Sequence, residues 1–215
     1  MASYSTILFD LDGTLTDPKV GITKSVQYAL SKLGIKEPDL ERLTSFIGPP
    51  LNLSFQQKYH FSSAEAQQAV EYYREYFKTK GMYENVVYES IPWLLKSLKD
   101  ESRNLVVATS KPTVFAQKIL DHFGIGQFFD HVVGSNLDST RSDKTEIIEY
   151  TMIQYSDLPK SDFIMIGDRE HDIIGANSNG IDSIGVTYGY GSREELTQAK
   201  VTYIADVIDD LIKLL

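Results

Sequence analysis

The sequence contains no cysteine among its 215 residues, so it can form neither a disulfide nor a metal site with thiolate ligands. It also lacks any hydrophobic run long enough to span a bilayer, and we expect no membrane partner. Residues 1–6 have neither the positive region nor the long apolar stretch of a signal peptide. These absences together predict a cytoplasmic location.

An excess of basic residues is missing as well, since the net charge is −9. Residues 17–83 carry 9 Lys and Arg against 7 Asp and Glu, a balance of +2, which leaves −11 for the rest of the chain. Proteins that bind nucleic acid neutralise its phosphates with Lys and Arg, so this balance argues against a nucleic acid polymer as partner. The acidic part is compatible with a site that recruits a divalent cation.

The pattern of apolar residues changes near residue 84. Between residues 20 and 81, apolar residues recur at helical spacing in four segments. From residue 84 onward, predicted strands alternate with helical segments, and the strands fall at residues 105–109, 131–134, 162–166 and 183–187. Such alternation is typical of an α/β fold, in which a parallel sheet is covered by helices on both faces.

The most informative segment is residues 7–16, an apolar β-type run that ends in two carboxylates, a glycine and two hydroxyls. Because side chains alternate along a strand, Asp10 and Asp12 point the same way. Two neighbouring carboxylates repel each other unless a cation lies between them or one of them carries a proton. An EF-hand calcium loop is excluded, since Leu15 and Gly21 would occupy its glycine and glutamate positions. The segment therefore indicates a site with its own chemistry.

The sequence DLDGTL at residues 10–15 resembles the nucleophile motif of the haloacid dehalogenase-like hydrolase superfamily. Three later segments fit the remaining motifs of that superfamily: a second apolar strand ends in Thr109 and Ser110, a helix starts at Lys144, and a further strand leads into GDREHD at residues 167–172. Ligands of parallel α/β sheets bind at the carboxyl ends of the strands, where these motifs lie. Within the superfamily, the chain is most similar to the phosphoglycolate phosphatase-like branch.

This resemblance implies a domain arrangement. Residues 1–16 and 84–215 would form a Rossmann-like catalytic core, and residues 17–83 would form an inserted α-helical cap. The hinges of the cap would lie near residues 16–17 and 83–85.

The resemblance also implies a mechanism. Asp10 would be the nucleophile that forms an aspartyl-phosphate, and Asp12 would protonate the leaving group and then deprotonate the attacking water. The cofactor would be Mg²⁺, which prefers oxygen ligands and bridges to substrate phosphate. Its ligands would be the carboxylates of Asp10, Asp168 and Asp172 and the backbone carbonyl of Asp12. The phosphate would be bound by Lys144 and Thr109, with Ser110 as an alternative to Thr109.

The predicted activity is the Mg²⁺-dependent hydrolysis of small phosphate monoesters of the phosphoglycolate, nucleotide or sugar phosphate class. Arg169 stands where phosphoglycolate phosphatases usually have serine, and Thr145 replaces the proline that usually follows the motif lysine. The first departure leaves the substrate open. In the cap, Lys24 and residues 48–51 are the first candidates for contact with the leaving group.

Three alternatives stay open. The first is a haloacid dehalogenase, which needs no acid for a halide leaving group, so the presence of Asp12 argues against it. The second is a phosphomutase, which would keep Asp10, Asp12 and the metal. A silent regulatory module is disfavoured because every expected catalytic position is filled. We expect a small phosphorylated metabolite as partner and a monomer or weak homodimer as the assembly.

Overall fold

The computed structural model describes residues 4–138 and 140–215, which divide into two compact units. The first, here called the core unit, comprises the chain up to Asp17 together with Val87–Leu215. The second, the inserted unit, is Pro18–Val86. The chain passes from one unit to the other through two short strands that pair with each other, β2 (Thr16–Asp17) and β3 (Val86–Val87). No helix of the described residues is long and apolar enough to cross a membrane.

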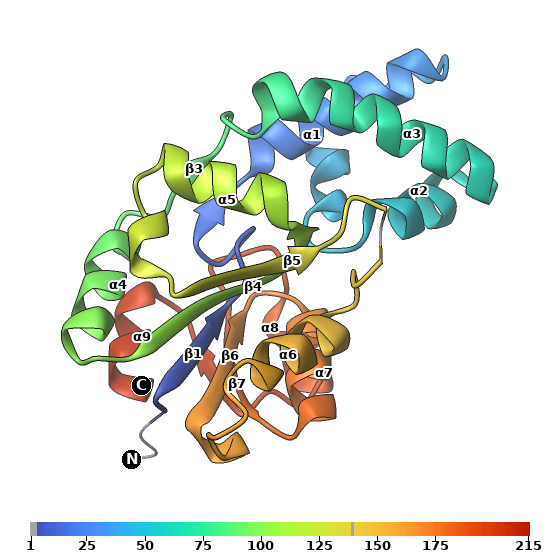
Figure 1. The fold of residues 1–215 in the computed structure, drawn as a ribbon. Coiled ribbons are helices and arrows are strands. Elements are labelled where there is room, and N and C mark those ends of the chain that lie inside the picture. Colours follow the sequence, from blue (N-terminus) through green and yellow to red (C-terminus); the bar gives the residue numbers. More distant parts are fainter. Residues whose placement is uncertain (1–3, 139) are drawn as a thin grey trace. The chain divides into compact units, whose positions relative to one another are not determined.

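The core unit is built on a six-stranded sheet in the order β5-β4-β1-β6-β7-β8, and every neighbouring pair is parallel (Figure 1). The strands are β1 (Thr6–Phe9), β4 (Asn104–Pro112), β5 (His131–Ser135), β6 (Phe163–Gly167), β7 (Asp182–Val186) and β8 (Tyr203–Ala205). Central strands of a parallel sheet are buried on both faces, which explains the continuous apolar runs of β1 and β6. The predicted Rossmann-like α/β fold class is confirmed.

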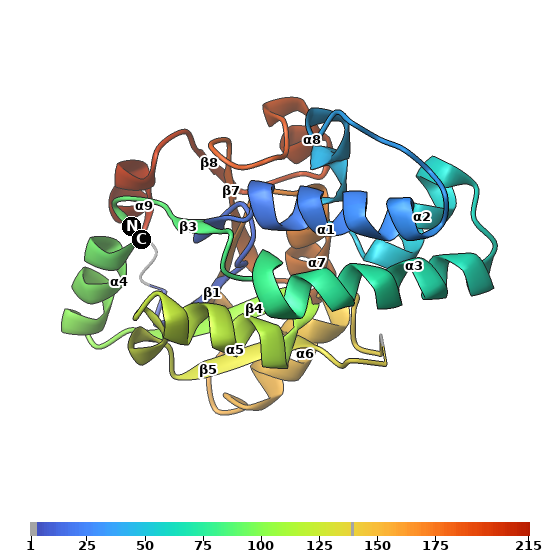
Figure 2. The same ribbon diagram turned by 90° about the horizontal axis from the view of Figure 1, so that it is seen from above.

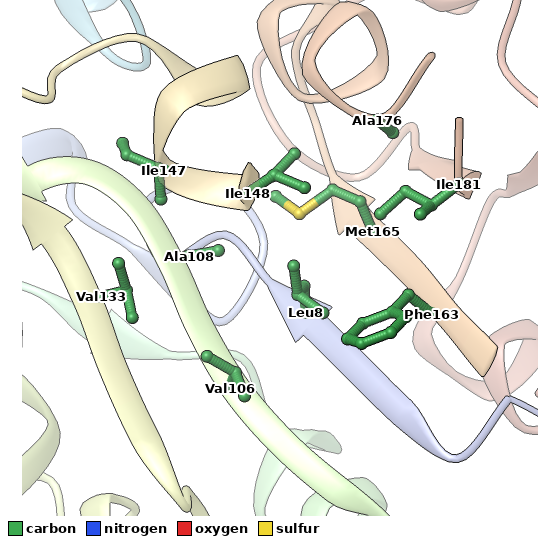
Figure 3. Packing of buried hydrophobic residues seen from close by; sticks show 10 residues of the cluster. All are labelled: Leu8, Val106, Ala108, Val133, Ile147, Ile148, Phe163, Met165, Ala176 and Ile181. Carbon is green, nitrogen blue, oxygen red and sulfur yellow. The ribbon is translucent and has the colours of Figure 1, made fainter. Parts of the chain in front are cut away.

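One face of the sheet packs against α6 and α7, and the side chains that fill this layer come from alternate strand positions (Figure 3). Leu8, Val106 and Met165 belong to this buried layer, together with Ile147 of α6 and Ala176 of α7. Because alternate side chains point to opposite faces of a strand, the neighbours of these strand residues are buried on the other face.

Six α-helices are described in the core unit, together with two short 3₁₀ helices. The α-helices are α4 (Ile91–Asp100), α5 (Thr113–His122), α6 (Lys144–Ile153), α7 (Glu170–Asn179), α8 (Arg193–Gln198) and α9 (Ile208–Leu214). The 3₁₀ helices are η3 (Gly126–Phe128) and η4 (Lys160–Asp162). The helices α4, α5, α6 and α7 each lead into the next strand of the sheet, as in other doubly wound folds.

The described residues of the inserted unit form helices and the short end strand β3. The helical elements are α1 (Lys19–Lys32), η1 (Glu41–Phe46), α2 (Leu51–Tyr59), α3 (Ser63–Tyr76) and the π-helical turn η2 (Phe77–Gly81). Helices α1 and α3 lie side by side (Figures 1 and 2). A Cβ on Gly21 would lie 1.9 Å from the carbonyl oxygen of Gly81, so α1 and η2 can approach this closely only with glycine at residue 21. That this unit acts as a cap stays a prediction.

Candidate active site

The first strand delivers two acidic side chains to the carboxyl end of the sheet. Asp10 and Asp12 are only 4% and 8% exposed. The chain then turns tightly, since the amide of Thr16 donates to the carbonyl of Leu11 and that of Gly13 donates to Thr16. Gly13 has φ +86°, and a Cβ there would lie 2.2 Å from Oδ2 of Asp168. Glycine is therefore required both by the backbone conformation and by the approach of Asp168.

Lys144 lies among these acidic groups. Its Nζ is 2.8 Å from Oδ1 of Asp10 and 2.5 Å from Oδ1 of Asp172, and it donates to the carbonyl of Ala108 at 2.8 Å. The helix that carries it is capped by Asp143, whose side chain accepts from the amide of Thr145. Burial alone would lower the pKa of Lys144, but the two carboxylates outweigh it and raise that pKa. The side chain is therefore a buried ammonium.

Two further carboxylates come from the end of β6 and the start of α7. Asp168 and Asp172 are 0% and 1% exposed, and one carboxylate oxygen from each lies within 4.8 Å of one from Asp10. Burial, followed by the charges of Asp10 and Asp172, raises the pKa of Asp168 well above its ordinary value. Burial also raises the pKa of Asp172, although the Lys144 charge opposes it. The protein alone thus leaves this negative charge incompletely compensated.

A second ion pair joins the ends of β1 and β4. Nζ of Lys111 is 2.8 Å from Oδ2 of Asp12, and both side chains are largely buried. The other oxygen of Asp12, Oδ1, is buried and has no hydrogen-bond partner among the described residues. Burial raises the pKa of Asp12 despite the Lys111 charge, which acts to lower it. A carboxyl group in this state is suited to exchange a proton.

The two hydroxyl residues predicted to bind phosphate lie beside this pair. Thr109 is 2% exposed, and its hydroxyl accepts from the amide of Lys111 at 3.3 Å. Ser110 follows it in a half-buried position. The ladder between β4 and β5 shifts register between Thr109 and Pro112, so this end of the strand departs from regular pairing. Lys144 is the charged member of the three predicted phosphate-binding residues, and it forms ion pairs with Asp10 and Asp172.

The segment at residues 188–191 completes the surroundings of Asp168, although none of the four motifs includes it. The amide of Tyr190 donates to Oδ2 of Asp168 at 2.8 Å. A Cβ on Gly189 would lie 2.4 Å from Cβ of Asp168, and one on Gly191 would lie 1.9 Å from its carbonyl oxygen. The two glycines are the signal in the sequence that could have located this segment, because they mark a close approach of backbone.

The arrangement can hold a divalent cation. Four carboxylates and two ammonium groups meet here, a net charge of −2 when all are ionised, and one divalent cation would bring it to zero. Oδ1 of Asp168 is buried and, within the part of the chain that the structure describes, has no hydrogen-bond partner. Oxygen ligands without nitrogen or sulfur are what Mg²⁺ prefers. The residues present therefore fit this ion.

The sequence profile of the haloacid dehalogenase-like hydrolases matches residues 7–186. The chain belongs to this family. It is 52% identical to a 5'-nucleotidase of Pseudomonas aeruginosa over 95% of this chain and 92% of that protein. It is 36% identical to the tyrosine-protein kinase PtkA of Mycobacterium tuberculosis, with coverages of 95% and 70%. A crystal structure described as a predicted phosphatase from Clostridium acetobutylicum superposes with a TM-score of 0.95, at 53% identity and coverages of 99% and 98%. The family membership that the four motifs indicated is confirmed.

Proposed function

We propose that this hydrolase is a Mg²⁺-dependent phosphatase of small phosphate monoesters that works through an aspartyl-phosphate at Asp10. The chain is a phosphoric monoester hydrolase. The observation that supports this mechanism most strongly is the position of Lys144, whose ammonium forms ion pairs with both Asp10 and Asp172. Such a group neutralises a carboxylate that must approach an anionic phosphate.

Asp10, Asp168 and Asp172 would hold the metal through carboxylate oxygens, and Asp12 would add its backbone carbonyl. When bound, Mg²⁺ would supply positive charge that offsets the charge of the phosphoryl oxygens during transfer.

In the first step, a carboxylate oxygen of Asp10 attacks phosphorus, and the bond between phosphorus and the leaving-group oxygen breaks. That oxygen takes a proton from Asp12, the carboxyl group whose pKa burial raises. In the second step, a water oxygen attacks the same phosphorus while Asp12 takes a proton from the water, which releases phosphate and restores Asp10. Lys144 neutralises charge in both steps, and the hydroxyl of Thr109 or Ser110 would donate to a phosphoryl oxygen.

Nucleoside 5′-monophosphates are the substrate class to test first, because the relative at 52% identity over nearly the whole chain is named 5'-nucleotidase. Phosphoglycolate is the second class, since a relative from Colwellia psychrerythraea at 27% identity is named phosphoglycolate phosphatase. Another relative is named tyrosine-protein kinase, so phosphotyrosine should be tested as a substrate and a tyrosine peptide as a phosphoryl acceptor.

The test is a panel of these phosphate esters with Mg²⁺ and with EDTA, beside the Asp10→Asn variant. We expect release of phosphate that needs Mg²⁺ and is lost in the variant. A matched control is Asp157→Asn, which changes an exposed aspartate of the core unit in the same way. Undiminished turnover in metal-free protein, or in Asp10→Asn, would contradict the proposal.

A further inference from the structure

Tyr190 contacts two acidic residues at once, one through its backbone and one through its side chain. Its amide donates to Oδ2 of Asp168 at 2.8 Å. Its hydroxyl donates to Oδ1 of Asp17. Asp17 is the last residue of the core unit before the inserted unit starts at Pro18. One residue thus joins the candidate metal site to the point where the chain leaves the core unit.

The backbone around Tyr190 has little room to adjust. Gly189 and Gly191 both press against Asp168, where even one added carbon would overlap with its atoms. The preceding Tyr188 donates its hydroxyl to the carbonyl of Thr14 at 3.0 Å, and its ring packs edge-on against Tyr88 at 5.1 Å between centroids. Segment 188–191 is therefore fixed to the DLDGTL turn at one residue and to Asp17 at another.

These contacts leave Asp168 with one oxygen occupied and one available. Oδ2 accepts from Tyr190, whereas the buried Oδ1 lacks a hydrogen-bond partner within residues 4–138 and 140–215. A donor on one oxygen sets the rotation of the carboxylate and so decides where the other oxygen points. Groups that orient a metal ligand in this way typically contribute about 10- to 100-fold to metal affinity.

We propose that Tyr190 is a positioning residue for the divalent cation. Its hydroxyl bond to Asp17 holds the residue in place, and its amide then sets the orientation of the Asp168 carboxylate. The inference rests on the proposed function in one respect, the use of Asp168 as a metal ligand. It adds that Asp17, which is no ligand itself, contributes to metal affinity through Tyr190.

The experiment is calorimetric titration of Mg²⁺ into the full chain and into four variants. Tyr190→Phe removes the hydroxyl but keeps the amide bond to Asp168, and Asp17→Ala removes the acceptor. The third variant combines both changes. The fourth, Tyr150→Phe, is the matched control, since it deletes the hydroxyl of an exposed tyrosine of the core unit.

We expect each single variant to bind Mg²⁺ about 10-fold more weakly, at the lower end of the range for such groups. The double variant should bind no more weakly than the weaker single variant, because both changes break the same bond. Tyr150→Phe should bind close to wild type. Saturating Mg²⁺ should restore kcat in Tyr190→Phe, which a general structural defect would not allow.

Three results would overturn the inference: Tyr190→Phe binding as tightly as wild type, equal losses in Tyr150→Phe and Tyr190→Phe, or additive losses in the double variant. If wild type binds no Mg²⁺ at all, both this inference and the proposed function fail. If wild type binds Mg²⁺ but hydrolyses no phosphate ester, the proposed function fails while the binding data still decide the role of Tyr190.

Discussion

Replacing Asp168 by asparagine should make the metal-free protein more stable while removing its response to Mg²⁺. The carboxylate oxygens of Asp10, Asp168 and Asp172 lie within 4.8 Å of one another in a buried site, where the Lys144 ammonium is paired with Asp10 and Asp172. The raised pKa of Asp168, caused by burial and then by the other two carboxylates, shows that ionising it opposes folding. Asparagine has the same shape without the charge and can still accept from Tyr190.

The size of the effect follows from these distances. Two unit charges at this 4.8 Å limit repel by about 3.5 kcal/mol at the effective dielectric constant of roughly 20 that suits protein sites. Proton uptake by Asp168 relieves part of this repulsion, so we expect a gain on the order of 1–2 kcal/mol. For a chain of this length, that corresponds to a rise in Tm of about 2–8 °C. Mg²⁺ at 100 times its Kd should stabilise the wild type by about 2.7 kcal/mol and the variant hardly at all.

The assay is thermal unfolding of both proteins in EDTA and across a Mg²⁺ titration, with Asp157→Asn as the surface control. The two curves of Tm against Mg²⁺ concentration should cross, with the variant higher in EDTA and the wild type higher at saturation. A variant that melts below the wild type in EDTA would refute the electrostatic reasoning. Equal Mg²⁺ responses would refute the assignment of Asp168 as a ligand.

Three more predictions concern the other charged groups of the site. Lys144→Met should destabilise the protein by about 3–5 kcal/mol in urea unfolding, because it leaves two buried carboxylates without their ammonium partner; a loss under 1 kcal/mol would contradict the buried ion pairs. Asp12→Asn should slow hydrolysis of alkyl phosphates by roughly 10²- to 10⁴-fold and that of p-nitrophenyl phosphate far less, since a good leaving group needs no acid; equal losses would remove Asp12 from that role. Without Mg²⁺, the contribution of Asp168 to stability should fall as the pH rises from its ordinary pKa of 3.8 through the raised value. The wild type should therefore lose stability relative to Asp168→Asn over that pH range. Parallel curves of stability against pH for the two proteins would contradict this.

The sequence indicated which residues meet at the carboxyl end of the sheet, because each motif lies at the end of an apolar strand or the start of a helix. Phe9 pairs with Val107 on one side and Ile166 on the other, so residues that follow these strands meet at one edge. Lys144 reaches Asp10 although Thr145 replaces the usual proline, because the Asp143 cap also starts the helix at this point.

Other contacts depend on geometry that a linear pattern does not contain. Lys111, which pairs with Asp12, lies where the register of β4 shifts, and apolar periodicity cannot predict such a shift. Tyr190 contacts Asp168 through its backbone, so its side chain type carries no signal of that bond. Strand β8 has three residues, too few for an alternating pattern to be recognised. Residues 41–46, which lie within the stretch of helical spacing between residues 20 and 81, form a 3₁₀ helix.

The central claim is that Asp10 becomes covalently phosphorylated during turnover, and acid quenching followed by peptide mass spectrometry tests it most directly. The enzyme is mixed with Mg²⁺ and a hydrolysed substrate, quenched while turnover proceeds, and digested, with a parallel sample treated with hydroxylamine. The account predicts one phosphoryl group on the peptide that contains Asp10, its loss in hydroxylamine, and its absence in Asp10→Asn. A phosphoryl group on a serine, threonine or histidine, or full-rate turnover with no phosphorylated peptide, would contradict the account.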